Sequence, residues 1–110
     1  MQNIDEATAR QIQELQILEQ NLQNLMLQRQ AFQVEENETE NALNELKKLK
    51  EDAYKIIGQI MIKTNKEEIE KDLKHKKEII ALRIKSIEKQ ESATREQITK
   101  LRDEITSKLK

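Results

Sequence analysis

The sequence predicts a protein dominated by α-helix, in which two long helices fold back on each other as an antiparallel coiled coil joined by a short β-hairpin. Three observations predict it. Residues 1–52 and 66–110 each carry an uninterrupted helical pattern, the chain has no proline, and its one glycine, Gly58, lies in an apolar, isoleucine-rich stretch between them. The expected organisation is a single domain, 1–110, with a helix in 1–52, a hairpin in 53–64 and a second helix in 65–110.

The composition favours an elongated coiled coil over a compact globule. Only 35% of the 110 residues are hydrophobic and 37% are charged, with one Phe, one Tyr and no Trp. Disordered segments share that balance but are usually rich in Pro, Gly or Ser and lack a period. Here Glu, Lys, Gln, Leu and Ile dominate, and these residues form or tolerate helix.

The first helix is predicted from a heptad series of a and d positions. Asp5 or Asn3 is expected to cap its start. A helix over residues 5–52 would be roughly 70 Å long at ~1.5 Å per residue. The series consists of Ile4, Thr8, Gln11, Leu15, Leu18, Leu22, Leu25, Arg29, Phe32, Glu36, Thr39, Leu43 and Leu46.

The second helix opens on two overlapping capping-box patterns. Thr64 with Glu67 fits the first, and Asn65 with Glu68 fits the second. Its heptad series consists of Ile69, Leu73, Lys77, Ile80, Ile84, Ile87, Glu91, Thr94, Ile98, Leu101 and Ile105. Because the two helices are of similar length and joined by a short connection, they should lie side by side.

Charges along the two helices select the antiparallel register. If the chain reverses at Gly58 and Gln59, two residues face each other when their numbers add up to about 117. The acidic run 35–40 then meets the basic run 76–85. Arg29 falls near Glu88 and Glu91. Each exposed pair stabilises by only ~0.2–1 kcal/mol, so their agreement in sign matters more than their sum.

The segment Tyr54–Lys63 is expected to be a hairpin with Gly58 at the first turn position. In that register Ile57 pairs with Ile60 and Ile56 pairs with Met61, and both faces are apolar near the turn. A lone two-stranded hairpin is marginal in water and its edges are open to pairing. We therefore expect several hairpins to combine into a shared sheet or barrel. The alternative is a simple apolar loop that caps the coiled coil.

The stretch from Asp52 to Lys63, with its Tyr-Lys-x-x-Gly segment, resembles the central hairpin of β-type prefoldin subunits. The run from Ala81 to Glu91, which closes on a base followed by Gln-Glu, is similar to the second helix of that family. The resemblance covers nearly the whole chain, and the single hairpin indicates the β type, because α-type subunits carry two. Many family members continue in a polar tail beyond the position of Lys110.

The resemblance implies an ATP-independent holdase that captures unfolded polypeptides and passes them to a group II chaperonin. It implies a hexamer of two α-type and four β-type subunits, whose hairpins build a β-barrel platform from which coiled coils project. The residues expected in the platform are Tyr54, Ile56, Ile57, Gly58, Ile60, Met61 and Ile62.

The ends of the coiled coil are the expected client-binding tips. The apolar residues there are Ile4, Ile12, Leu15, Ile98, Leu101, Ile105 and Leu109. Some of them must pack between the helices, and frayed ends would expose others. Leu15 and Leu101 fit ordinary core positions, whereas Ile12 and Leu109 are the better candidates for exposed contacts.

Other function classes find little support in these residues. The lone His75 has lysine neighbours, which disfavour metal binding, and no phosphate loop, nucleophile elbow or zinc spacing is present, so we expect no enzyme activity and no cofactor. Residues 1–52 hold 11 acidic and 5 basic side chains, and residues 53–110 hold 10 and 15, so the halves complement each other. Interspersed acids and the absence of stacking aromatics argue against nucleic-acid binding.

The expected setting is soluble and cytoplasmic, since there is no cysteine, no membrane-length apolar run and no signal-peptide pattern in residues 1–6. The competing hypothesis for function is a structural tether whose coiled coil binds one defined protein partner. That hypothesis predicts one saturable ligand and no general affinity for unfolded chains.

Overall fold

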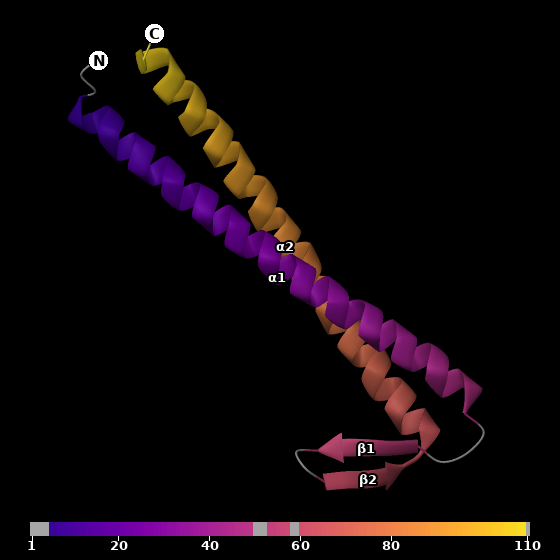
Figure 1. The fold of residues 1–110 in the computed structure, drawn as a ribbon. Coiled ribbons are helices and arrows are strands. Elements are labelled where there is room, and N and C mark those ends of the chain that lie inside the picture. The colour runs from indigo at the N-terminus through magenta and orange to yellow at the C-terminus, as the bar shows by residue number, and fades with distance from the viewer. Residues whose placement is uncertain (1–4, 50–52, 58–59, 110) are drawn as a thin grey trace. The chain divides into compact units, whose positions relative to one another are not determined.

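The computed structural model describes residues 5–49, 53–57 and 60–109 and contains two long helices and two strands, drawn in Figure 1. Gly58, Gln59 and Ile4 lie outside the described residues. In chain order the elements are α1 (Glu6–Lys48), β1 (Ala53–Ile57), β2 (Ile60–Thr64) and α2 (Lys66–Leu109).

Side chains that accept backbone hydrogen bonds define both helix starts. Asp5 Oδ1 accepts the Thr8 N–H at 2.6 Å, and Asn65 Oδ1 accepts the Glu68 N–H at 2.8 Å. Each contact satisfies one of the N–H groups that lack a partner in the first helical turn. The structure thus selects Asp5 and Asn65 among the capping candidates, and Thr64 belongs to β2 instead.

Helix α1 ends at Lys48, earlier than the expected boundary at residue 52. The Leu49 N–H donates to the Leu46 carbonyl at 3.2 Å, a tightened last turn that closes the helix. Lys66 Nζ then donates to the carbonyls of Lys47 at 3.4 Å and Leu49 at 3.3 Å. An ammonium group at this position satisfies terminal carbonyls and complements the negative end of the helix dipole.

The two strands pair antiparallel as a two-stranded sheet (Figure 1). Ile57 pairs with Ile60 and Ile56 with Met61, which is the register expected from a turn at residues 58–59. Tyr54 pairs with Lys63 at the far end of the ladder.

The chain divides into two compact units: unit 1 combines Met1–Gln30 with Ser86–Lys110, and unit 2 is Ala31–Lys85. In unit 1 the N-terminal part of α1 contacts the C-terminal part of α2 through Gln11 with Glu104 and Glu19 with Arg102. Among the described residues of this unit, the buried apolar side chains all come from α2, and Thr8 of α1 is buried with them. Those side chains are Ile87, Ile98, Leu101 and Ile105.

Unit 2 holds the remainder of both helices and the two strands. Here both helices contribute buried side chains: Leu43 and Leu46 from α1, Ile80 and Ile84 from α2. Thr39 is also buried, and its hydroxyl donates to the Glu35 carbonyl at 2.8 Å, so this buried hydroxyl is satisfied.

Contacts between the helices confirm the predicted antiparallel fold-back within each unit. In unit 2, Lys77 forms an ion pair with Glu40, and Lys76 Nζ lies 3.7 Å from Glu35. The Arg83 guanidinium lies 5.7 Å from the Phe32 ring centroid. In unit 1, Arg102 pairs with Glu19 at 2.9 Å.

Candidate functional site

The strands carry the residues expected in the oligomerisation platform. Tyr54, Ile56 and Ile57 lie on β1, and Ile60, Met61 and Ile62 lie on β2. Gly58 is outside the described residues. Met61 is 63% exposed, so the helices of its own chain leave this position on the sheet open to solvent. A two-stranded sheet also has two unpaired edges.

The residues expected at the client-binding tips fall into three classes of burial. Ile98, Leu101 and Ile105 are buried between the helices of unit 1. Ile12 and Leu15 are half-buried, and Leu109 is exposed. Ile4 lies outside the described residues. The first three side chains can therefore touch another molecule only where the two helices separate, whereas Ile12, Leu15 and Leu109 are partly accessible as they stand.

Polar contacts surround these apolar side chains near the ends of unit 1. Gln11 donates through Nε2 to Glu104 at 3.3 Å and accepts from Lys108 Nζ at 2.9 Å. A groove of about 270 Å³ runs between the helices here. Its lining consists of Gln11, Glu14, Leu18, Gln97, Lys100, Leu101 and Glu104. The groove is open and mostly polar, so it provides surface contact rather than an enclosed reaction site.

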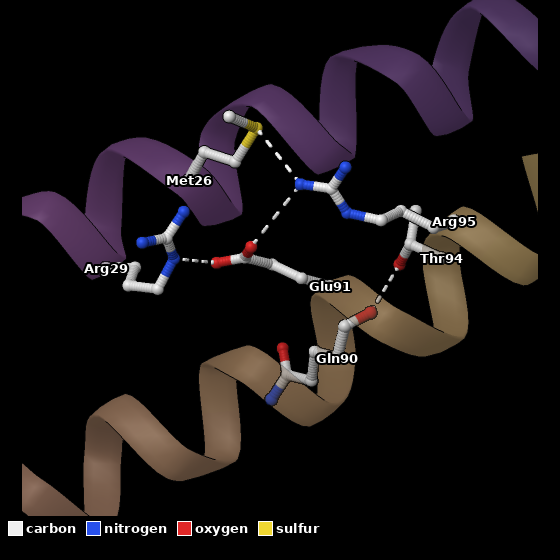
Figure 2. Close-up of polar contacts among 6 residues, drawn as sticks. All are labelled: Met26, Arg29, Gln90, Glu91, Thr94 and Arg95. Atoms are coloured by element: carbon white, nitrogen blue, oxygen red, sulfur yellow. Dashed lines mark hydrogen bonds and ion pairs between the residues drawn. The ribbon is translucent and has the colours of Figure 1, made fainter.

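An ionic cluster interrupts the apolar core of unit 1 (Figure 2). Arg29 Nε donates to Glu91 Oε1 at 2.6 Å, and the other carboxylate oxygen lies 3.8 Å from the Arg95 guanidinium. The side chains of Glu91 and Arg29 are only 8% and 23% exposed. Arg95 also lies 3.9 Å from the Met26 sulfur, as Figure 2 shows. A carboxylate this deeply buried is stable only with such partners.

Exposed ion pairs shift a few pKa values in unit 2. The hydrogen bond from Lys77 lowers the pKa of Glu40 below its ordinary value, and the same bond raises the pKa of Lys77. A hydrogen bond from Lys74 likewise lowers the pKa of Glu70. Each shift favours the charged pair at neutral pH, and none creates a group poised for proton transfer.

Sequence reasoning placed Arg29 near Glu91 but missed the third member, Arg95. The signal was available, since residues four apart lie on the same side of a helix. It also missed two exposed aliphatic side chains on α1, Ile17 and Leu27, because it followed only the heptad series that forms the core.

Among the residues that the structure describes, no cluster of three or more His, Cys, Asp or Glu side chains could hold a metal ion. Neither long helix, over the same residues, offers an apolar stretch able to cross a bilayer.

Comparison with known proteins identifies the family. The family model for the prefoldin subunit matches residues 9–110. The chain belongs to the prefoldin family. Among prefoldin beta subunits, that of Pyrobaculum islandicum is 42% identical over 80% of this chain and 72% of its own length. That of Pyrococcus furiosus is 35% identical over 100% of this chain and 96% of its own length.

The prefoldin fold is shared as well as the sequence. A crystal structure of the prefoldin beta subunit from Thermococcus strain KS-1 matches with a TM-score of 0.92 and 32% identity. The match covers 100% of this chain and 98% of that one. The long helix pair is therefore that of a prefoldin chaperone subunit with coiled-coil architecture.

Proposed function

We propose that this chain is the β-type subunit of an ATP-independent holdase that binds unfolded polypeptides at the terminal end of its helix pair. The match to the Thermococcus prefoldin beta subunit over the whole chain carries this proposal. The complete assembly contains two α-type and four β-type subunits and delivers its clients to a group II chaperonin in the cytoplasm.

The exposure of Met61 and the open edges of the two-stranded sheet support assembly through the residues from Tyr54 to Ile62. An isolated two-stranded sheet is marginally stable, and Met61 is left largely in solvent by its own chain. Pairing of strand edges from several chains would satisfy the open edges of the sheet and could cover Met61. The six apolar positions and Gly58 named above are the expected platform contacts.

Accessible apolar side chains near the chain ends support client binding there. Leu109 is exposed and Ile12 and Leu15 are half-buried, while Ile98, Leu101 and Ile105 become available only as the helix ends separate. Contacts of this kind are individually weak. Several arms in one assembly would act together and raise the affinity without any new contact.

The test of client binding uses the complete assembly and heat-unfolded citrate synthase, whose aggregation is followed by light scattering. Replacing Ile12 and Leu109 with Ser should reduce protection, since both side chains are accessible. The matched control is Leu82→Ser, which removes an exposed apolar side chain from unit 2. Equal protection by both variants would contradict the proposal, as would loss of all protection by the control.

The test of the platform replaces Ile57 and Ile60, which pair across the strands, with Asp. Native mass spectrometry, with and without an α-type subunit, should show dissociation of the assembly. An unchanged native mass would refute the role of the strands while leaving client binding to be judged by the scattering assay.

A further inference from the structure

An open groove of about 480 Å³ lies between the two helices of unit 1. Its walls carry four exposed amide side chains: Asn21, Asn24 and Gln28 on α1, and Gln90 on α2. The rest of its lining consists of Leu25, Ala93 and Thr94. We call this surface the amide groove. Because Gln28 and Gln90 come from different helices, a molecule that lies in the groove can contact both walls.

No charged side chain lines the amide groove, although 37% of the residues in the chain are charged. Between residues 20 and 34 of α1 the one charged residue is Arg29, and its guanidinium is bonded to the buried carboxylate of Glu91. The other charged residues near the groove in sequence, none of which lines it, are Glu19, Glu88, Lys89, Arg95 and Glu96. A lining without charge does not select a partner by the sign of its charge.

Three of the four amides have no hydrogen-bond partner within the described part of the chain, and these are Asn21, Gln28 and Gln90. The fourth, Asn24, accepts a hydrogen bond from Gln20 Nε2 at 3.3 Å. The Thr94 hydroxyl is already used, because it donates to the main-chain carbonyl of Gln90 at 2.8 Å (Figure 2). A side-chain amide carries two donors and an acceptor. The groove therefore presents donors and acceptors side by side, without a partner of its own chain for most of them.

We propose that the amide groove binds the main chain of an extended, unfolded polypeptide. Its amides donate to the carbonyls of that chain and accept from its N–H groups, which every residue except proline carries whatever its side chain. Asn21 and Gln28 are seven residues apart on α1, about 10.5 Å along the helix, and an extended chain spans about 10 Å in three residues. The inference rests on the proposed function and deepens it, because it names the part of a client that is recognised in addition to apolar side chains.

The amide groove is continuous with the groove that Glu14 and Lys100 help to line nearer the chain ends. Leu18 of that groove lies three residues before Asn21, and residues three or four apart share one side of a helix. A client held by apolar side chains at the ends can therefore lay its main chain into the amide groove within unit 1. Each hydrogen bond in so open a groove competes with water and is weak, and several arms of one assembly add such contacts together.

The experiment compares two forms of one probe, a fluorescein-labelled peptide of Leu-Ser-Gly repeats. In the second form the glycine nitrogens are methylated, which removes main-chain donors and leaves every side chain in place. Fluorescence anisotropy with the complete assembly should show roughly tenfold tighter binding of the unmethylated form. The combined variant Asn21→Ala, Gln28→Ala and Gln90→Ala should reduce the affinity for the unmethylated form to that for the methylated one, and should leave binding of the methylated form unchanged.

The matched control removes three exposed amides that line neither groove, through Gln13→Ala, Gln16→Ala and Gln30→Ala. It should keep the full difference between the two peptides, and circular dichroism should show unchanged helicity for both triple variants. Equal binding of the two peptides by the original assembly would overturn the inference. So would an unchanged difference in the amide-groove variant, or its loss in the control. Ile12→Ser with Leu109→Ser should weaken both peptides alike, and its failure to do so would count against the proposed client-binding ends instead.

Discussion

The ionic cluster in unit 1 predicts a strong energetic coupling between Arg29 and Glu91. We consider Arg29→Leu, Glu91→Leu and the double variant. Arg29→Leu leaves a carboxylate that is 8% exposed without its 2.6 Å partner, and only Arg95 at 3.8 Å remains to compensate it. Glu91→Leu leaves Arg29, whose side chain is 23% exposed and can turn toward water. The two single substitutions should therefore differ in cost.

The magnitudes follow from the burial of each charge. Removing one partner of a buried ion pair costs about 3–5 kcal/mol, and the remaining Arg95 places Arg29→Leu near the lower end of that range. Glu91→Leu should cost about 1–2 kcal/mol, since the remaining guanidinium is more accessible to water. The double variant replaces the pair by two leucines on facing core positions and should lie within about 1 kcal/mol of the original chain. The coupling between the two sites is then about 3 kcal/mol or more.

Thermal and urea unfolding followed by circular dichroism, at one fixed protein concentration, measure these differences. A cost near 3 kcal/mol for Arg29→Leu should lower the midpoint temperature by roughly 12–24 °C, given about 4–8 °C for each kcal/mol in a domain of this size. Arg10→Leu is the control, because Arg10 forms an exposed pair with Glu6 and should change stability by less than about 0.5 kcal/mol. If the costs of the two single substitutions simply add in the double variant, the buried pair is not coupled and the reasoning is refuted.

Three further predictions concern core packing, a helix cap and acid stability. Ile80→Ala should destabilise the protein by about 2–4 kcal/mol because Ile80 is 3% exposed. Leu82→Ala, at a position that is 68% exposed, should cost under about 0.5 kcal/mol. Equal costs of the two substitutions in urea unfolding would contradict this prediction. Asn65→Ala should cost about 0.5–2 kcal/mol through loss of the cap on α2, and Asn65→Asp should retain it. Hydrogen bonding to Thr8 lowers the pKa of Asp5, so the stability from this contact is present above the ordinary carboxyl pKa and is lost as pH falls through the lowered value. Asp5→Asn should remove that pH dependence in an acid titration of helicity.

Much of the fold could be predicted because it depends on contacts that are local or repeat along the chain. A cap requires one side chain three residues from one N–H, so Asp5 and Asn65 stood out as candidates. The fold-back followed from charges of opposite sign, and the pairing of Lys77 with Glu40 confirms it. The end of α1 at Lys48 differs from the predicted end at residue 52, and the carbonyls of Lys47 and Leu49 there accept hydrogen bonds from the distant Lys66, a contact that no local pattern predicts.

The candidate site was less predictable for a related reason. The sequence identified which residues near the chain ends are apolar, but a heptad series does not say how deeply each one is buried. Packing against the opposite helix decides that Ile98 and Ile105 are buried while Leu109 is exposed. The ionic cluster around Glu91 could also be predicted only in part from the sequence. Its third member, Arg95, contacts Glu91 on the same helix and Met26 on the other helix.

Ile17 and Leu27 on α1 show why burial must be combined with periodicity. On a helix that carries two series with the same spacing, periodicity alone does not distinguish the core from an exposed face. Leu22 and Leu27 are both leucines in a four-three series, yet only Leu22 is half-buried within unit 1.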